Sequence, residues 1–400
     1  MHNATHQQTR THNVQLVLKT IFDAGKISRA AVARETGLTA VTVSQIVTEL
    51  MTSGLVVEGE RGESVRGRAP ILISVDKDAQ HILSVHIKND AIDSAIVNLQ
   101  GDIIFTDQVA IGAERGEQVV ELILQALDTL QTKADRPLLG IGIAAPGIID
   151  TDRGVVEQAV YFGWRDLPLG QQIADRYGIP VHIANASQVT ALAAFIFDNM
   201  PRASNVAVVH VGQDVGAGFI VNGQFFVGDG YGAGEIGHIV LDTEGEPCRC
   251  GNRGCLETLV NTAAIVREAR RLAAQVPAGP LAHLVEKQQE QLTFDDLLPL
   301  YHQGDPQLSA LATRTAQALG HVIAGIAVIL NIEKILLVGS VTRFGEAWLA
   351  RIQEQVTQRG LPRLTTRTTL AISKHGSDMV TLGATALVLA RELGITLGRR

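Results

Sequence analysis

Residues 234–257 read Gly-Glu-Ile-Gly-His-Ile-Val-Leu-Asp-Thr-Glu-Gly-Glu-Pro-Cys-Arg-Cys-Gly-Asn-Arg-Gly-Cys-Leu-Glu and hold every cysteine of the 400-residue chain. Three thiolates and one imidazole make a complete tetrahedral zinc set, which is typical of a structural site. Gly251 and Gly254 allow the tight turns that bring three sulfurs to one ion. The alternative is one disulfide and a spare thiol, but nothing else in the chain indicates an oxidising compartment. The four candidate zinc ligands are His238, Cys248, Cys250 and Cys255.

The composition is that of a soluble globular protein of two or three domains, with 46% hydrophobic and 19% charged residues. Only 4% of the residues are aromatic, which suits buried parallel strands covered by helices. The first ten residues have no apolar core and so do not form a signal peptide. The longest apolar run, 322–330, is too short to span a bilayer. We expect a cytoplasmic protein with no membrane insertion.

The charge is unevenly distributed. The chain has a net charge of −7, but residues 1–75 carry eight basic and six acidic side chains, so this segment is +2 and the remainder −9. A mildly basic N-terminal module on an acidic body fits a DNA-binding domain attached to a sensor.

The N-terminal segment has the pattern of a helix-turn-helix. Apolar residues between 13 and 22 have helical spacing, Ser28 can cap a second helix over 29–36, and Thr39 can cap a third over 40–52. The short turn between the last two is helix-turn-helix spacing. One face of the third helix is apolar and should be buried, whereas the other carries short polar or methyl-bearing groups that suit base edges in the major groove. A solvated face is the alternative, although Glu and Lys would be commoner there. The candidate DNA-contacting residues are Thr39, Val41, Thr42, Ser44, Gln45 and Thr48.

A wing follows the third helix. A strand over 55–58, a basic glycine-rich loop over 59–69 and a strand over 71–75 predict a hairpin whose arginines contact phosphate or enter a minor groove. Arg66 and Arg68 are the candidates. A basic hairpin without a DNA role would look similar, but it seldom follows three helices of this kind.

The body reads as two α/β lobes with a cleft between them. Strands and helices alternate through it, and both halves contain similar elements. We expect strands at 81–87 and 91–99 around a turn at 88–90, and at 103–105, 138–145, 180–184, 207–211, 217–221 and 334–338. We expect helices at 117–130, 186–197, 306–330 and 382–392.

The body resembles the ROK family (repressors, open reading frames and kinases) over nearly its whole length. The best match is residues 234–257, and further matches are Ala-Ala-Pro-Gly-Ile-Ile-Asp at 144–150, the glycine-rich segment 212–218 and Gly383-Ala384. With the winged helix, the chain is similar to the repressor branch. The resemblance implies an actin-like (ribonuclease-H-like) sugar-kinase fold after the winged helix, a structural zinc and a monosaccharide pocket. The expected domains are 1–75, a first lobe of 80–190 plus about 370–400, and a second lobe of 191–369.

The resemblance also bears on catalysis. Family kinases have an Asp-Ile-Gly-Gly-Thr type phosphate loop where this chain has His86-Ile87-Lys88-Asn89-Asp90, and a catalytic aspartate where this chain has Ala186. Alanine cannot accept a proton from the attacking hydroxyl, and the loss of the glycines removes the close backbone approach that phosphate needs. A second phosphate loop is replaced by 212–214. We therefore expect no kinase activity and no catalytic residues.

The groups on the sugar side are retained. The resemblance implies that Asn185, Glu235, His238 and Glu257 hydrogen-bond sugar hydroxyls, with one nitrogen of His238 on zinc and the other toward the sugar. The alternative is that Glu235 and Glu257 make no sugar contact and only support the loop that carries the candidate zinc ligands.

The sequence therefore predicts a sugar-responsive transcriptional regulator, most simply a repressor of sugar uptake or catabolism genes. Two winged helices in a homodimer, or four in a tetramer, would bind a palindromic operator, and a monosaccharide would shift the lobes. The alternatives are a bifunctional sugar kinase and a repressor that is controlled by a protein partner.

Overall fold

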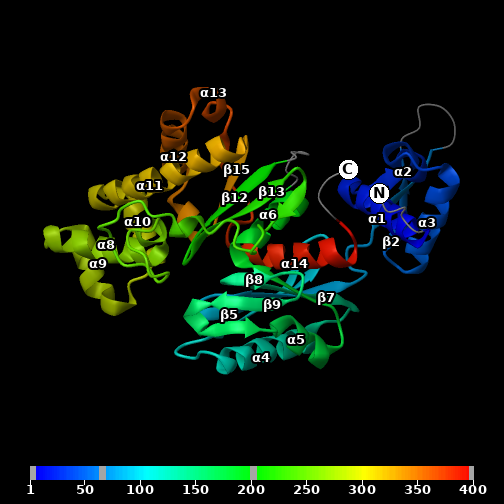
Figure 1. Cartoon of the computed structure of the whole chain (residues 1–400), viewed down its shortest axis with the longest axis horizontal. Coiled ribbons are helices and arrows are strands. Elements are labelled where there is room, and N and C mark those ends of the chain that lie inside the picture. The colour runs from blue at the N-terminus through cyan, green and yellow to red at the C-terminus, as the bar shows by residue number, and fades with distance from the viewer. Residues whose placement is uncertain (1–5, 63–68, 199–204, 396–400) are drawn as a thin grey trace.

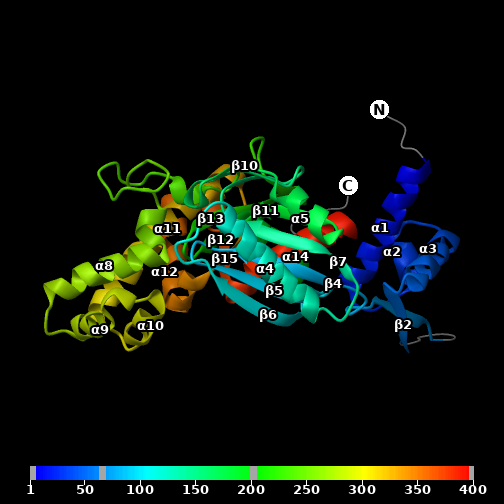
Figure 2. The same ribbon diagram turned by 90° about the horizontal axis from the view of Figure 1, so that it is seen from below.

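The computed structural model describes residues 6–62, 69–198 and 205–395 of the chain. Figure 1 shows a small N-terminal domain at one end, a first α/β lobe beside it and a second α/β lobe at the other end. Figure 2 shows the same order from below. The predicted α/β class, with an N-terminal helix-turn-helix before two lobes, is confirmed.

The N-terminal domain combines three helices with a three-stranded sheet of order β1-β3-β2. Its elements are α1 (His6–Ala24), β1 (Ile27–Ser28), α2 (Arg29–Thr36), α3 (Ala40–Thr52), β2 (Val56–Arg61) and β3 (Ile71–Val75). The predicted caps set the bounds of α2 and α3: Ser28 Oγ accepts from the Ala31 amide at 3.2 Å, and Thr39 Oγ1 from the Thr42 amide at 3.1 Å. The hairpin of β2 and β3 is the predicted wing, and β1 adds a third strand that was not predicted.

The first helix is longer than its apolar spacing indicated. α1 begins at His6 rather than near residue 13, because its first turns are polar and carry no periodic signal. Arg10 on α1 pairs with Glu49 on α3 at 2.6 Å, which ties the two helices together on the surface. This exposed pair contributes little stability by itself.

The first lobe is built on a five-stranded sheet of order β11-β7-β4-β5-β6, in which β4, β7 and β11 are parallel. Helices α4 (Glu117–Lys133) and α5 (Leu169–Tyr177) cover its outer face and enclose one apolar core with it. The sheet strands are β4 (His81–Ile87), β5 (Ala91–Asn98), β6 (Ile103–Ala110), β7 (Leu138–Ala145) and β11 (Val181–Asn185). A second, small sheet, which was not predicted, holds β8 (Ile148–Asp150), β9 (Val155–Ala159) and β10 (Trp164–Leu167), with the 3-10 turn η1 (Val160–Phe162) before β10.

The second lobe is built on a sheet of order β14-β13-β12-β15-β16. Its strands are β12 (Val206–Val211), β13 (Val215–Val221), β14 (Gln224–Phe226), β15 (Lys334–Val338) and β16 (Thr369–Ile372). Its helices are α7 (Glu257–Val260), α8 (Thr262–Gln275), α9 (Pro280–Gln288), α10 (Phe294–His302), α11 (Pro306–Leu330), α12 (Glu346–Arg359) and α13 (Pro362–Thr365). Short 3-10 turns complete it: η2 (Ile236–His238), η3 (Gln289–Gln291), η4 (Ser340–Phe344) and, after β16, η5 (Gly376–Asp378). The bounds of α11 agree with the prediction, and no prediction covers α7 to α10.

Two helices lie between the two large sheets. α6 (Ala186–Phe197) and α14 (Met379–Glu392) share one buried cluster with strands from both lobes. Two glycines make this packing close: a Cβ on Gly142 would overlap the Ala384 carbonyl, and a Cβ on Gly383 would lie 2.6 Å from the Val189 carbonyl oxygen. The lobes therefore meet through a packed core rather than through a flexible linker.

The end of α14 belongs to the N-terminal domain. Val388, Leu389 and Leu393 are buried in the same cluster as Val17 and Ile21 of α1. Figure 2 shows the C-terminal helix reaching toward α1. One helix thus runs from the interlobe core to the N-terminal domain, a span of about 21 Å for its 14 residues.

α11 is long and apolar enough to cross a membrane by length and composition. Half of its most apolar window is buried inside the protein, and its residues belong to the core of the second lobe. This burial is what a core helix requires. Among the described residues it is the one helix that passes that length test.

Candidate functional site

The three cysteines and His238 come together in the loop that follows η2. The Sγ atom of Cys248 lies 3.5 Å from His238 Nδ1, and the Sγ atoms of Cys250 and Cys255 lie 3.7 Å apart. All four ligand atoms lie within 4.8 Å of one another. A tetrahedral zinc ion with bonds of about 2.3 Å to sulfur and 2.0 Å to nitrogen spaces its ligands by roughly 3.5 to 3.8 Å. The two measured pairs have this spacing, and the four side chains together could hold a metal ion.

The cysteines are free thiols rather than a disulfide pair. A separation of 3.7 Å between the sulfurs of Cys250 and Cys255 is far beyond the roughly 2.05 Å of an S–S bond. Burial raises the pKa of Cys248, and it raises the pKa of Cys255 to about 12. A divalent cation that binds here would displace the protons of these thiols, since thiolate is the form that binds metal. The donor set fits zinc.

His238 links this cluster to the groups expected to hold a sugar. Its Nδ1 atom faces Cys248, while Nε2 lies 3.7 Å from Glu235 Oε2. The ring therefore has one nitrogen toward the thiols and one toward a carboxylate. Burial raises the pKa of Glu235, although the neighbouring His238 opposes the shift.

Asn185 lies at the start of α6 and caps it. Its Oδ1 atom accepts from the amides of Ser187 and Gln188 at 2.9 and 3.1 Å, and its Nδ2 atom donates to the Gly147 carbonyl at 2.9 Å and to Glu235 at 3.2 Å. These four bonds use the whole hydrogen-bonding capacity of an amide side chain. Asn185 therefore aims Glu235 in this structure, and a sugar hydroxyl would have to replace one of its bonds.

Glu257 begins α7 directly after the cysteine loop. It is 8% exposed, and its Oε2 atom accepts from the Val215 amide at 3.2 Å. Burial, with Asp214 adding to the effect, raises the pKa of Glu257 to about 7. Glu257 thus connects the cysteine loop with the start of β13. Of the four predicted sugar residues, Asn185, Glu235 and His238 form one contact chain, and Glu257 acts on Glu235 by charge.

Gln188 is a site residue that the motifs do not mark. It is 1% exposed, and its Nε2 atom donates to the carbonyls of Tyr231 and Ala233, both at 2.8 Å. These bonds fix the glycine-rich loop that carries Glu235. The available signal was a long amide side chain inside a mostly apolar helix.

Arg249, within the cysteine loop, reaches the first lobe. Its guanidinium lies 5.4 Å from the ring centroid of Tyr161 on η1, and the guanidinium of Arg115 lies 4.3 Å from the same ring. Such cation–π contacts contribute about 0.5 to 2 kcal/mol each. The cysteine loop of the second lobe is therefore held against the first lobe through one aromatic ring.

The expected DNA-contacting face of α3 is exposed. Val43, Ile46, Val47 and Leu50 are buried, while Val41, at 68% exposure, lies with Gln45 and Thr48 on the surface. Ser44 and Thr42 are partly buried, and the hydroxyls of Thr39 and Thr42 lie 2.9 Å apart at the N-terminus of α3. Arg66 and Arg68 lie outside the described residues.

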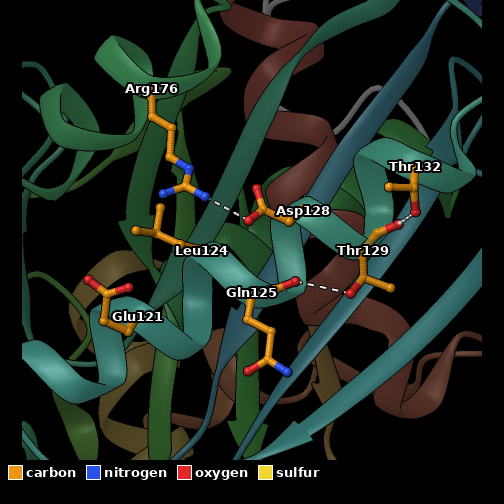
Figure 3. A pocket seen from close by; sticks show the side chains of 7 residues that line it. All are labelled: Glu121, Leu124, Gln125, Asp128, Thr129, Thr132 and Arg176. Atoms are coloured by element: carbon orange, nitrogen blue, oxygen red, sulfur yellow. Dashed lines mark hydrogen bonds and ion pairs between the residues drawn. The ribbon is translucent and has the colours of Figure 1, made fainter.

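A shallow hollow of about 410 Å³ lies elsewhere, on the outer face of the first lobe beside α4 (Figure 3). Arg176 reaches over it and pairs with Asp128 at 2.7 Å. Glu121, Gln125 and Thr129 line it from α4. It shares no residue with the candidate zinc, sugar or DNA sites.

Comparison with known proteins identifies relatives over nearly the whole chain. A model of the ROK family matches residues 82–391. A xylose repressor from Caldicellulosiruptor bescii is 29% identical over 393 residues, which cover 97% of this chain and 98% of the relative. A glucokinase from Halalkalibacterium halodurans is 30% identical over 321 residues, covering 79% of this chain and 97% of the relative. The crystal structure of a ROK family transcriptional regulator, homologous to the Escherichia coli Mlc protein, has a TM-score of 0.83 and 26% identity and covers 97% of this chain and 98% of that one.

Proposed function

The chain belongs to the ROK family, and we propose that it is a sugar-responsive transcriptional repressor that binds operator DNA through its N-terminal winged helix. The observation that carries this proposal is the extent of the similarity. A repressor aligns with 97% of the chain, including the winged helix, whereas a glucokinase aligns with 79%. In this chain α3 also presents an exposed, nearly uncharged face.

We propose that a monosaccharide binds between the lobes, at the chain of contacts formed by Asn185, Glu235 and His238, with Glu257 beside it. Paired hydrogen bonds from carboxylates and imidazole suit neighbouring sugar hydroxyls. A sugar can change DNA binding only by the difference in its affinity for the DNA-competent and DNA-incompetent states. α14 offers a physical connection, because it lies in both the interlobe core and the core of the N-terminal domain.

We propose that His238, Cys248, Cys250 and Cys255 hold a structural zinc ion. The spacing of the four donors supports this, and a complete protein ligand set leaves no open position for a catalytic water. The ion would fix the orientation of the His238 ring and thereby place its second nitrogen toward the sugar. We also propose that the protein acts in the cytoplasm as a homodimer or tetramer on a palindromic operator.

A sugar kinase is the second candidate, because a glucokinase is among the relatives. The residue after Asn185 is alanine, which supplies no general base, and the 88–90 turn contains no glycine. We therefore propose that the chain does not phosphorylate sugars. ATP turnover that depends on a sugar and is lost in the Cys250→Ser variant would contradict this.

Selection of bound duplexes from random DNA with the purified protein tests the repressor proposal, since it needs no known operator. We expect one enriched palindromic sequence. The Gln45→Ala variant should bind it about 5- to 150-fold more weakly, the effect of losing one good base contact. Thr52→Ala, at the other end of α3, is the matched control and should bind like wild type. Enrichment of no sequence would contradict the proposal.

A panel of pentoses, hexoses, amino sugars and sugar phosphates, added to the bound complex, tests the effector. We expect one sugar class to change operator affinity. Glu235→Gln should abolish the response while operator affinity in the absence of sugar stays unchanged. An affinity that no sugar alters would contradict the effector proposal.

A further inference from the structure

Two loops from opposite lobes are hydrogen-bonded to each other. The turn 88–90 joins β4 to β5 in the first lobe, and the turn 212–214 joins β12 to β13 in the second. Asn89 Nδ2 donates to Asp214 Oδ1 at 3.0 Å, and Gln213 Nε2 donates to Asp90 Oδ2 at 2.7 Å. Each loop thus supplies one amide and one carboxylate, so the two bonds are reciprocal.

Hydrogen bonds within each lobe hold both turns in place. The Lys88 amide donates to the Ala91 carbonyl at 2.9 Å, which closes the first turn, and the Gly212 amide donates to the Asp214 carbonyl at 3.0 Å, which closes the second. Asn261 Nδ2 also donates to the Gln213 carbonyl at 3.0 Å. The two turns therefore meet in defined conformations, and separating the lobes requires breaking both cross-lobe bonds.

Two histidines lie beside these turns. His86 precedes the first turn by two residues, and His210 precedes Gly212. The ring of His210 lies so close to the second turn and to the end of β15 that a Cβ on Gly212 would lie 3.2 Å from it and a Cβ on Gly339 2.9 Å. Its Nδ1 atom is buried without a partner among the described residues. Imidazole therefore occupies the space against the glycines at the ends of β12 and β15.

The local charges are unfavourable for phosphate. Asp90 and Asp214 each accept one cross-lobe bond, and Lys88 is already paired with Asp93 at 2.8 Å. The side chains of the two turns therefore satisfy one another, and an anionic ligand would meet two carboxylates here.

We propose that residues 88–90 and 212–214 form an interlobe latch. It joins the lobes with the protein's own side chains. The latch sets the balance between the joined and separated arrangements of the two turns. The effector's action on DNA binding then depends on this balance. This regulatory consequence rests on the function proposed above.

A charge-swap experiment tests the latch in free, full-length protein, without sugar or DNA. Asn89→Asp places a carboxylate 3.0 Å from Asp214, and the double variant Asn89→Asp with Asp214→Asn restores an amide–carboxylate bond in the opposite direction. The readout is hydrogen–deuterium exchange of the backbone in 86–92 and 210–216. Gln171→Ala, which removes an amide–carboxylate bond of 2.7 Å within α5, is the matched control.

We expect Asn89→Asp to speed exchange in both segments about 2- to 13-fold, the range for loss of one net hydrogen bond. The double variant should return to wild-type exchange, and the control should not change it. Faster exchange only in 86–92, or no rescue in the double variant, would overturn the latch. Circular dichroism would show whether the single variant is misfolded. In that case the double variant, which should fold, is the test, and its exchange must match that of the wild type.

Operator affinity separates the structural part from the regulatory part. If the latch regulates DNA binding, Asn89→Asp changes operator affinity, or its ratio with and without the effector, at least about 2-fold, and the double variant restores it. Rescued exchange with wild-type affinities and ratios would overturn the regulatory part alone. Failure of the wild-type protein to select any DNA would bear on the repressor proposal and not on the latch.

Discussion

At the scale of single residues, the site depends on side chains that hold others in place. Asn185 uses all of its hydrogen-bonding capacity within the protein, and Gln188 ties down two carbonyls of the loop that carries Glu235. His238 faces the thiols with one nitrogen and Glu235 with the other. The clustering of His238 with the three cysteines was predictable from sequence, because the four residues lie within one short stretch. Gln188 was not, since its partners lie more than 40 residues away and are backbone atoms.

Replacement of Gln188 by methionine should loosen the loop 227–235. The two carbonyls lose their donors, and each unsatisfied buried group costs about 1 to 3 kcal/mol. We expect faster hydrogen–deuterium exchange in this loop and weaker effector binding, with α6 otherwise unchanged. Gln172→Ala, on the exposed surface of α5, should behave like wild type. Wild-type exchange of the loop in the methionine variant would show that Gln188 does not position it.

Replacement of Cys250 by serine should remove the zinc. A site left with three of its four protein ligands loses affinity by at least about tenfold, so we expect the metal content of the purified protein to fall accordingly. The segment 234–257 should then become protease-sensitive, because its turns depend on the ion. Thr243→Ala in the same loop is the control. Metal analysis that finds no zinc in the freshly purified wild-type protein would refute the structural-zinc proposal.

At the scale of elements, capping residues decided what the sequence could predict. The starts of α2 and α3 were predicted from Ser28 and Thr39, because a cap fixes a helix start locally. The small sheet of β8 to β10 gave no such signal. Its strands are short, and β8 and β9 pair with a register shift. The sequence therefore shows no sustained alternation of apolar and polar residues there.

Truncation of Leu389 to alanine tests the role of α14. This residue is fully buried in the cluster shared with α1, and a cavity there should cost about 2 to 5 kcal/mol. We expect weaker operator binding although the residue is not on α3. Leu297→Ala, fully buried in the core of the second lobe, is the matched control and should destabilise that lobe without weakening DNA binding. Equal loss of DNA binding in both variants would contradict a specific role for α14. The comparison is made by calorimetric unfolding and by fluorescence anisotropy with labelled operator.

At the scale of the whole molecule, the interlobe contacts were beyond the reach of the sequence. Asn89 and Asp214 are 125 positions apart, and Gln213 and Asp90 are 123 apart. Each loop seen alone shows only a short polar turn between two strands. Pairing across the lobes emerges only when two separate sheets are placed against each other through α6 and α14. The two-lobed arrangement itself was predictable, because strands and helices alternate in both halves.

The histidines beside the latch should make stability depend on pH. Burial lowers the pKa of His86 from 6.5 to about 3; His210 and Lys88 add to the shift and Asp93 opposes it. Burial also lowers the pKa of His210, which Asp214 opposes. Between pH 6.5 and 3 the unfolded chain binds a proton that folded His86 does not. The stability that is present above pH 6.5 is therefore lost as the pH falls, by about 1.4 kcal/mol per pH unit for this group.

Urea unfolding at pH 7, 6 and 5 measures this dependence. His86→Asn, which is neutral throughout, should show a shallower decline than wild type. His12→Asn, on the surface of α1, is the control and should decline like wild type. Identical declines for wild type and His86→Asn would contradict the assignment.

The C-terminal helix has a further consequence for anyone building biosensors from this protein. Because α14 completes the hydrophobic core of the winged helix, a chimera that exchanges residues 1–75 alone would pair one protein's DNA-binding domain with another protein's helix. A functional transplant should carry the matching residues of α14 along with the domain, even though the two segments lie at opposite ends of the gene. The modular unit for engineering is thus defined by shared packing, and it is discontinuous in sequence.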